Sequence, residues 1–346
     1  MPVRNGERYL EIAVESIRNQ TFHDFEFIIV DDASTDSTPA LLKAISDSRV
    51  RVITNAKASG ISRSLNLAID IARGRFIARM DADDVASPHR LAKQVDWLER
   101  HPATVLCGTF AERVDAEGSP LSKIRRPQTN VEIQWHLLTA NPFIHPSVMF
   151  CAKAFRDAGR YCTRLTCAQD YDLWCRLAQQ GECCNLPDPL LKYRFHDGAI
   201  SANKRAEQLR ITQQSSQQLL LKIGIVNSLE EGEMFQAIAG RHLTHKSVSD
   251  FARQQVLRFP EMVDGFFEKI TCNDDFACKI VCRCRQRLRK RILAQIDVKR
   301  LGFGQNLDLL RIARRIDPSG MKLSSICSRV ASRIMGRVNQ PSYTED

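Results

Sequence analysis

The sequence predicts an α/β protein with a mostly parallel central sheet flanked by helices, followed by an α-helical C-terminal region. Short apolar runs alternate with amphipathic segments through the first two hundred residues, which is the pattern of βαβ units. Acidic residues directly follow two of these runs, at the sheet edge where parallel sheets bind ligands. Beyond residue 205 only helical periodicity is found. We therefore expect two domains, residues 1–204 and residues 205–346.

Apolar runs predict buried strands, and the amphipathic segments between them predict helices. The strands are expected at residues 25–30, 50–54, 75–80 and 104–109. The helices are expected at residues 6–20, 37–45, 62–74 and 87–102. Pro39 favours the first turn of its helix, and Gly74 marks the end of another. The first helix begins almost at the first residue, so no strand is expected before it.

Basic residues are concentrated in the second half of the chain. Residues 205–346 contain 24 Lys and Arg against 15 Asp and Glu, whereas residues 1–204 contain 26 against 25. Within residues 276–338 the count is 16 basic to 3 acidic residues. A surface of this charge attracts an anionic partner.

Two segments of this basic region, 276–296 and 324–338, have the spacing of amphipathic helices. Their apolar positions are Phe276, Ile280, Cys284, Leu288, Ile292 and Ile296, and then Ile326, Val330 and Ile334. One interpretation is a helical extension packed on the N-terminal domain, with a solvated basic side. The other is docking of residues 276–338 on an anionic membrane surface. Nucleic-acid binding is disfavoured, because no aromatic interleaving accompanies the charge.

The sequence shows neither a membrane-spanning stretch nor a secretory signal. No apolar run approaches the ~18 residues that a bilayer requires, and the N-terminus has no apolar h-region. The 12 cysteines follow no disulfide or zinc spacing, which favours reduced thiols. We therefore expect a cytoplasmic protein, or one bound peripherally to the inner face of the cell membrane.

Three carboxylates, Asp81, Asp83 and Asp84, follow the apolar run at 75–80. Carboxylates this close raise one another's pKa unless a cation lies among them. Asp81 and Asp83 form a D-x-D pair whose oxygens suit Mg²⁺ or Mn²⁺, and a cation held this way keeps positions that phosphates can fill. The other interpretation is a set of solvated loop carboxylates beside the helix that starts near Ser87.

A second acidic pair, Asp31 and Asp32, ends the strand expected at 25–30. A carboxylate there can accept a hydrogen bond from N3–H of a uracil or thymine ring, or it can cap a turn. A phospho-accepting receiver domain would also have two acids at this place. A D-x-D after a later strand does not fit that scheme.

Asp170 opens the helix predicted from "QDYDLWCRLAQQG" (169–181). An Asp at this position is commonly a cap, and the alternative is a general base that deprotonates an acceptor hydroxyl. His145 and His196 fall in loop segments. His196 is a candidate for a third contact to a metal or a phosphate.

Taken in order, these segments resemble the family 2 glycosyltransferases of the GT-A fold, the bacterial cell-surface polysaccharide type. The matching stretches are "MPVRNGERYLEIAVESIRNQTFHDFEFIIVDDASTDST", "GISRSLNLAIDIARGRFIARMDADDVASPHRL", "NPFIHPSVMF", "QDYDLWCRLAQQG" and "YRFHDGAIS". They lie within residues 1–204, with their order and spacing preserved.

The resemblance implies an inverting, metal-dependent transfer of a sugar from a UDP- or dTDP-type donor to a hydroxyl of a saccharide or lipid-linked acceptor. The process it implies is synthesis of exopolysaccharide, capsule or lipopolysaccharide. By the same resemblance Asp170 is the base, and Mg²⁺ or Mn²⁺ is held by Asp83, Asp81 and His196. The residues implied to contact the nucleotide-sugar are Pro2, Arg4, Asp32, Arg63, Asn66 and Asp81.

Three features depart from the family's pattern. Arg4 stands where the family usually has Tyr, so a guanidinium contact would replace base stacking. Gln169 stands where the family usually has Glu, which removes a charge beside Asp170. The family's first strand, central in its sheet, is expected before "MPVRN" and is missing, which would leave two sheet edges unpaired.

We interpret the missing strand as a start assigned too late, with Met1 an internal residue; otherwise the chain is a truncated, poorly active form. The alternative function is a catalytically inactive nucleotide-sugar-binding or membrane-scaffold protein. Metal-dependent hydrolysis of a UDP-sugar would separate this alternative from an active transferase.

Overall fold

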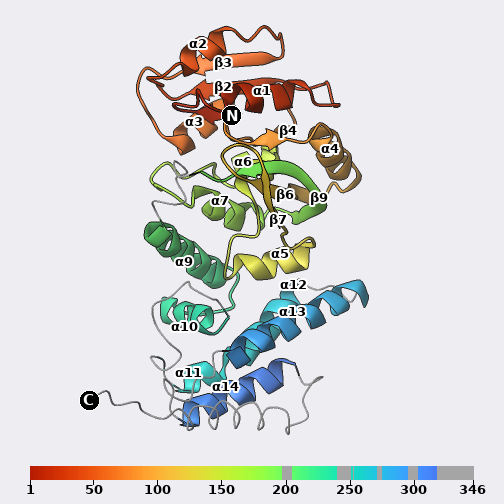
Figure 1. Ribbon diagram of the computed structural model, residues 1–346. Coiled ribbons are helices and arrows are strands. Elements are labelled where there is room, and N and C mark those ends of the chain that lie inside the picture. Colours follow the sequence, from red (N-terminus) through yellow and green to blue (C-terminus); the bar gives the residue numbers. More distant parts are fainter. Residues whose placement is uncertain (197–204, 240–250, 252, 271–274, 295–302, 318–346) are drawn as a thin grey trace, which may run out of the picture. The chain divides into compact units, whose positions relative to one another are not determined.

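The computed structural model describes residues 1–196, 205–239, 251, 253–270, 275–294 and 303–317. The chain forms two compact units, Met1–Leu219 and Leu220–Asp346 (Figure 1). The N-terminal unit contains every strand that the structure describes, and the described part of the C-terminal unit is helical. The expected domain boundary between residues 204 and 205 stays a prediction, because the division after Leu219 reflects how the chain packs and does not define functional domains.

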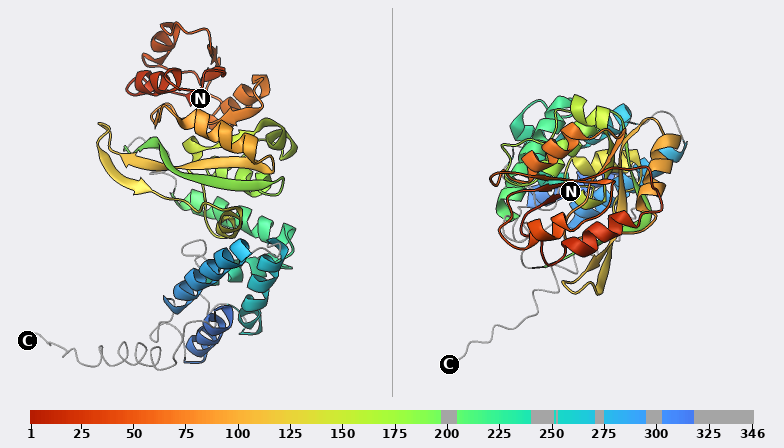
Figure 2. Two further views of the ribbon diagram at one scale, coloured as in Figure 1. Left: turned by 90° about the vertical axis from the view of Figure 1, so that its right-hand side faces the viewer. Right: turned by 90° about the horizontal axis from the view of Figure 1, so that it is seen from above.

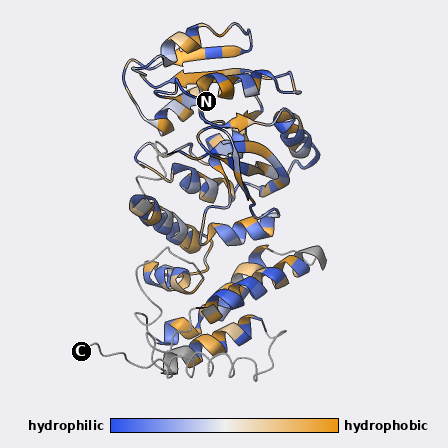
Figure 3. Cartoon of the chain, in the orientation of Figure 1, coloured by the Kyte–Doolittle hydropathy of each residue, from blue (hydrophilic) through white to orange (hydrophobic). Residues whose placement is uncertain are grey.

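The first sheet of the N-terminal unit has three parallel strands in the order β1–β2–β3. They are β1 (Pro2–Val3), β2 (Phe27–Asp31) and β3 (Val50–Thr54). The neighbouring helices are α1 (Leu10–Arg18), α2 (Thr38–Lys43) and α3 (Ile61–Ile71), of which α3 packs on β2. Every residue of β2 is buried, and Figure 3 shows its hydrophobic character. This strand is therefore the centre of the first sheet.

A short strand precedes α1, so the expectation of no strand at this place is wrong. The two residues of β1 pair in parallel with the last two residues of β2. The Met1 amino group donates to the Ile28 carbonyl at 2.8 Å, and Val30 N–H donates to the Met1 carbonyl at 2.9 Å. Two residues are too few to show the alternation of a strand, which explains why the sequence pattern did not reveal them.

The second sheet has the order β4–β8–β6–β9–β5, with β7 paired to β6. Its strands are β4 (Phe76–Ala78), β5 (Val85–Ala86), β6 (Thr104–Val114), β7 (Pro120–Ile124), β8 (Met149–Cys151) and β9 (Glu182–Arg194). The long strands β6 and β9 lie side by side and are parallel (Figure 2). The other pairs described here are antiparallel, so the expectation of a mostly parallel sheet holds only for the first sheet. Alternation of strands and helices does not reveal a strand that turns back on its neighbour.

Helices cover the second sheet and fix the loop that follows β4. They are α4 (Arg90–Arg100), α5 (Asn130–Leu137), α6 (Ala152–Asp157) and α7 (Gln169–Leu177), with the 3₁₀ turn η1 (His145–Ser147) before β8. Helix α4 packs on β6 and β9, α5 packs on β9, and α6 packs on β8. Arg90 is fully buried and donates to the carbonyls of Arg79 and Val148 at 2.7 and 3.2 Å. It thereby ties the end of β4 to the segment that leads into β8.

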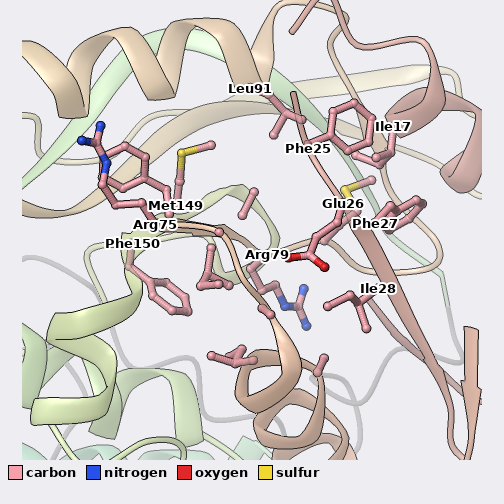
Figure 4. Close-up of a pocket in the computed structure, with 18 of the residues that line it drawn as sticks. Ile17, Phe25, Glu26, Phe27, Ile28, Arg75, Arg79, Leu91, Met149 and Phe150 are labelled. Carbon is pink, nitrogen blue, oxygen red and sulfur yellow. The ribbon is translucent and has the colours of Figure 1, made fainter. Parts of the chain in front are cut away.

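A cavity of about 590 Å³ is lined by residues of β2, α3, β4 and α4. Its wall is mostly apolar, and its charged members include Glu26, Arg75 and Arg79 (Figure 4). The edge strands β1 and β4 belong to different sheets, so no described backbone pairing joins the two sheets across this space. Burial, aided by the nearby charge of Arg79, lowers the pKa of the Met1 amino group to about 5. The amine is therefore neutral at pH 7.

The C-terminal unit buries the apolar face expected of the first basic segment. Its helices are α10 (Leu229–Ala239), α11 (Arg253–Leu257), α12 (Phe259–Ile270), α13 (Asp275–Ala294) and α14 (Phe303–Ile316), preceded by α9 (Arg205–Lys222), which spans the boundary. Along α13, Ile280, Cys284, Leu288 and Ile292 are all at most 3% exposed. They pack within the unit, where α13 contacts α14 and α10.

Two arginines of α13 have partners inside the C-terminal unit. Arg285 forms an ion pair with Asp264 at 2.7 Å, and Arg289 with Asp317 at 2.9 Å. The structure does not describe the side chain of Phe276, nor does it describe Ile296 or residues 324–338. Contact of residues 276–338 with an anionic membrane stays a prediction.

Two further expectations concern the cysteines and the membrane. The ten cysteines within the described ranges are all free, as their spacing predicts. None of the described helices combines the length and the apolar character needed to cross a bilayer.

Gly108 of β6 leaves no room for a side chain. A Cβ atom there would lie 2.1 Å from Asn185 Oδ1 and 2.8 Å from the Phe143 ring. Asn185 cannot yield easily, because its amide donates to the carbonyls of Pro127 and Pro142 at 2.7 and 3.1 Å. We expect Gly108→Ala to lower the melting temperature by several degrees, which corresponds to about 1–3 kcal/mol of overpacking. Thermal denaturation followed by circular dichroism measures this.

Gly265→Ala is the matched control. Gly265 lies inside α12, and nothing would lie within 4 Å of a Cβ atom added there. Because Ala favours a helix over Gly by about 1 kcal/mol, this variant should melt at the same or a higher temperature. Equal melting temperatures for Gly108→Ala and the wild type would contradict the tight packing of β6.

Candidate active site

A cleft of about 1120 Å³ lies in the N-terminal unit, at the ends of β1, β2, β4 and β9 and at the start of α7. Most of the residues singled out from the sequence line it: Pro2, Arg4, Asp32, Asp81, Asp83, Asp170 and His196. Arg63 and Asn66 are not among the lining residues. The structure therefore brings seven of the nine candidates to one cleft.

Asp32 follows β2 and shapes the loop before α3. Its oxygens accept hydrogen bonds from Asn55 Nδ2 at 2.7 Å, and from Ser59 N–H, Ser59 Oγ and Gly60 N–H at 2.8 Å each. Burial would raise the pKa of this carboxyl, but these hydrogen bonds lower it to about 2. Gly60, at φ +90°, supplies the left-handed turn that brings its N–H to Asp32. Most of the accepting capacity of Asp32 is thus used by its own loop.

Asn66 and Arg63 hold the backbone instead of facing the cleft. Asn66 donates to the Tyr161 carbonyl at 2.9 Å and accepts from Tyr161 N–H at 3.1 Å. Arg63 is exposed and donates to the Ser59 carbonyl at 3.2 Å. Both lie on α3, whose register places them away from the cleft. The structure offers no support for the predicted contacts of these two residues with a nucleotide-sugar.

Arg79 is the cation that lies among the carboxylates after β4. Its side chain is 2% exposed and forms an ion pair with Asp81. Burial would lower the pKa of this guanidinium, but the charge of Asp81 and its hydrogen bond raise it. The Arg79 guanidinium therefore neutralises part of the negative charge of the three carboxylates.

Asp83 and Asp84 complete an acidic cluster with Asp81. One oxygen of each carboxylate lies within 4.8 Å of the oxygens from the other two. Burial and the charge of Asp81 raise the pKa of Asp83 and, more strongly, that of Asp84. His196 Nε2 lies 3.0 Å from Asp83 Oδ2, so this imidazole belongs to the same cluster.

Arg194, the last residue of β9, fastens the acidic loop. Its backbone N–H donates to Asp84 Oδ1 at 2.8 Å, and its Nε donates to the Asp83 carbonyl at 2.8 Å. Its guanidinium also donates to the Ala116 carbonyl and lies 4.5 Å from the centre of the Tyr9 ring. The acidic loop is therefore held in one conformation from the β9 side.

The acidic cluster fits a hard divalent cation. Asp84 Oδ2 is buried and accepts no hydrogen bond from any described residue. Three carboxylates form an oxygen-rich donor set of the kind that Mg²⁺ and Mn²⁺ prefer. The residues that could hold the ion together are Asp81, Asp83 and Asp84, and His196 contacts this set through Asp83 alone.

Asp170 enters the cleft from the first turn of α7. Asn141 Nδ2 donates to Asp170 Oδ2 at 2.8 Å. Burial raises the pKa of the Asp170 carboxyl, although hydrogen bonds from Tyr171 N–H and from Asn141 oppose this. Ala168, which caps α7, has a left-handed φ of +52° and turns the chain into the helix. A carboxylate in this position is a candidate base.

His145, the other histidine noted in the sequence, also lines the cleft. Its Nε2 lies 3.0 Å from the Tyr161 hydroxyl. Burial and the charge of Arg79 lower its pKa well below the ordinary value, so the ring is neutral at pH 7. It contributes shape and a hydrogen bond to the cleft, but no charge.

Comparison with known proteins identifies the family. Residues 1–157 match the model described as Glycosyl transferase family 2. An uncharacterized glycosyltransferase of Haemophilus influenzae is 30% identical over 250 residues, which are 67% of this chain and 77% of that protein. The chain belongs to glycosyltransferase family 2, as the resemblance predicts.

Two relatives from Escherichia coli have more specific names. The O-antigen biosynthesis glycosyltransferase WbnJ is 32% identical over 207 residues, 57% of this chain and 78% of WbnJ. The UDP-Glc:alpha-D-GlcNAc-diphosphoundecaprenol beta-1,3-glucosyltransferase WfgD is 26% identical over 215 residues, 61% of this chain and 81% of WfgD.

A solved structure with the same fold is that of S. aureus TarS 1-349 in complex with UDP-GlcNAc. It aligns with a TM-score of 0.56 at 16% identity, over 92% of this chain and 89% of TarS 1-349. This likeness confirms the expected GT-A fold class.

Sequence reasoning assigned no role to Arg79 and Arg194, which line the cleft, or to Asn141 and Asp84, which contact or adjoin its carboxylates. Asn141 opens the quoted stretch "NPFIHPSVMF", and its position there was the available signal. Asp84 was noted beside the D-x-D pair, but only the fold turns its carboxylate toward the other two. Arg194 acts on residues more than a hundred positions earlier, which no local pattern reveals.

Asp170→Asn is expected to raise the melting temperature. The pKa of Asp170 is higher in the folded protein than its ordinary value of 3.8, so the ionised carboxyl costs stability. Wild-type stability should therefore fall as the pH rises from about 4 through the raised pKa, and the amide should remove this loss. We expect a gain on the order of 2–4 °C at pH 7.5, equivalent to about 1 kcal/mol. Differential scanning calorimetry between pH 4 and 8 measures it.

Asp172→Asn provides the control on the same helix. Asp172 forms an ion pair with Arg176 at 2.6 Å, so its neutralisation should not stabilise the fold. An equal or lower melting temperature for Asp170→Asn at neutral pH would contradict the inferred cost of this carboxylate.

Proposed function

We propose that this glycosyltransferase moves a sugar, with inversion, from a UDP- or dTDP-sugar to a hydroxyl of a saccharide or lipid-linked acceptor. The proposal includes a requirement for Mg²⁺ or Mn²⁺ and a role in synthesis of a cell-surface polysaccharide. Its family membership supports the reaction class, and the names of WbnJ and WfgD support the process and the type of acceptor. The UDP-GlcNAc complex of TarS supports a UDP-type donor.

The observation that carries the proposal is the sharing of one cleft by two kinds of carboxylate. The acidic cluster with Asp81 and Asp83 has a strong demand for a cation. Asp170 reaches the same cleft from a different element, away from this cluster in the sequence, and is hydrogen-bonded on one oxygen by Asn141. The acidic cluster thus suits a cation that binds a diphosphate, and Asp170 suits removal of a proton from the acceptor hydroxyl.

The donor half of the cleft includes Pro2, Arg4 and the loop held by Asp32. Asp81, Asp83 and His196 would hold Mg²⁺ or Mn²⁺, which when bound offsets the negative charge that develops on the leaving diphosphate. Arg79 keeps the acidic loop folded through its ion pair with Asp81.

Asp170 acts on the acceptor. Asn141 orients the carboxylate through Oδ2, and we assign Oδ1 as the oxygen that accepts the proton of the acceptor hydroxyl. As that proton moves to Oδ1, the hydroxyl oxygen bonds to the anomeric carbon and the bond from this carbon to the diphosphate oxygen breaks. The raised pKa of Asp170 makes the carboxylate a stronger base near neutral pH. A single displacement of this kind inverts the anomeric configuration.

Asp83→Ala or excess chelator should remove turnover of the sugar donor. Loss of the cation forfeits several kcal/mol of transition-state stabilisation, so we expect a decrease of about 100-fold or more. Release of UDP from a panel of UDP-sugars, with and without Mg²⁺ or Mn²⁺, measures this.

Asp96→Ala is the matched control, since Asp96 lies on the exposed face of α4 and pairs only with Arg100 in the described residues. It should retain wild-type turnover. Equal turnover in excess chelator would contradict the metal requirement. Absence of any turnover by the wild type across the panel would favour the inactive nucleotide-sugar-binding alternative.

Asn141→Ala should move the acid limb of the pH–rate profile to higher pH. The Asn141 hydrogen bond lowers the pKa of Asp170, so its loss should raise that pKa further. Less of the base is then ionised at a given pH below neutrality, and kcat falls there first. The control Asn19→Ala, an exposed residue at the end of α1, should leave the profile unchanged. An unshifted limb in Asn141→Ala would exclude Asp170 as the titrating base.

A further inference from the structure

We propose that Arg126 binds a phosphate group carried by the acceptor, beside the sugar whose hydroxyl is glycosylated. This inference rests on the proposed function and names the chemical class of its acceptor: a saccharide linked to a lipid through phosphate or diphosphate.

Arg126 lines the cleft and has no partner for its charge among the residues that the structure describes. It follows β7, lines the cleft and is only partly exposed. Its Nε is shielded from solvent and has no hydrogen-bond partner, and no described residue forms an ion pair with its guanidinium. Burying a charge without a partner is unfavourable, so this arrangement indicates a place prepared for an anion.

The other arginines that line the cleft are accounted for differently. Arg8 pairs with Glu117 at 3.3 Å, and Arg79 pairs with Asp81. Arg194 donates to backbone carbonyls, as described above. Arg4 is exposed. Arg126 therefore differs from the rest in being both partly buried and unpaired.

Arg126 and Asp170 line the same cleft, and hydrogen bonds connect the backbone beside Arg126 to the residue that holds Asp170. The amide of Asn185 donates to the carbonyl of Pro127, next to Arg126, and also to the carbonyl of Pro142. Pro142 follows Asn141, whose amide holds Asp170. A short series of hydrogen bonds thus connects the backbone at Arg126 to the candidate base. The acidic cluster, with a cation, would hold the donor diphosphate, so we assign the anion at Arg126 to the acceptor.

Phosphate is an anion whose geometry the guanidinium matches. Arginine can donate two parallel hydrogen bonds to phosphate oxygens, and such bonds are strongest where water is partly excluded. An acceptor sugar attached directly to a diphosphate would bring these oxygens within one sugar ring of the reacting hydroxyl. WfgD is named for an acceptor of this construction.

The test measures binding of farnesyl diphosphate, as a soluble lipid diphosphate, to the full chain with UDP and Mg²⁺ at saturation. Saturation removes the donor site as a competing position for the diphosphate. We expect Arg126→Met to weaken binding about 10- to 100-fold, the usual range for a charged hydrogen bond, and Arg126→Lys to restore part of it. UDP affinity should be unchanged in both variants, and farnesol should bind the wild type and Arg126→Met equally.

Arg125→Met is the matched control, because Arg125 is the exposed neighbour and does not line the cleft. It should bind farnesyl diphosphate like the wild type. Arg126→Met should not lower the melting temperature, which separates ligand binding from a structural role.

Three results would overturn the inference: no measurable binding of farnesyl diphosphate by the wild type, unchanged binding in Arg126→Met, or an equal loss of UDP affinity in that variant. The last result would assign Arg126 to the donor diphosphate. Arg126-dependent binding without turnover of any sugar donor would contradict the proposed function while supporting the anion site.

Discussion

The ion pair between Arg79 and Asp81 is the interaction on which the cleft depends. Three carboxylates within 4.8 Å of one another would repel if no positive group lay among them. Arg90 donates a hydrogen bond to the Arg79 carbonyl, and Arg194 of β9 donates one to the Asp83 carbonyl. The acidic loop is thus preorganised by arginines that donate to its backbone and to Asp81, and Asp84 Oδ2 has no hydrogen-bond partner among the described residues. A built-in guanidinium also explains how this loop folds before any ion binds.

Carboxylates in the cleft differ in basicity because their hydrogen-bond partners differ. Asp32 is buried, yet four donors lower its pKa to about 2 and keep it ionised. Asp170 also accepts hydrogen bonds, from Tyr171 N–H and Asn141, but burial outweighs them and raises its pKa. The first therefore serves as a fixed anion that shapes a loop, and the second as a group that can take up a proton. Residue type alone does not distinguish these roles; the number of donors around each carboxylate does.

Local sequence patterns predicted the parts of the molecule that local forces determine. The strands at β2 and β3 and the acidic residues after β2 and β4 follow from apolar runs and their ends, and the sequence placed them correctly. The antiparallel pairs of the second sheet and the two-residue β1 depend on contacts between distant segments. Asn66 shows the same limit within the site. It lies in a stretch that resembles the family, but its amide binds the backbone of Tyr161, 95 residues later.

The cavity between β2 and β4 bears on how the N-terminal unit meets water. It measures about 590 Å³, opens partly to solvent and has a mostly apolar wall. Water in this space would contact apolar side chains of the kind that a packed interior covers. The edge of each sheet at this place is therefore bordered by accessible apolar surface.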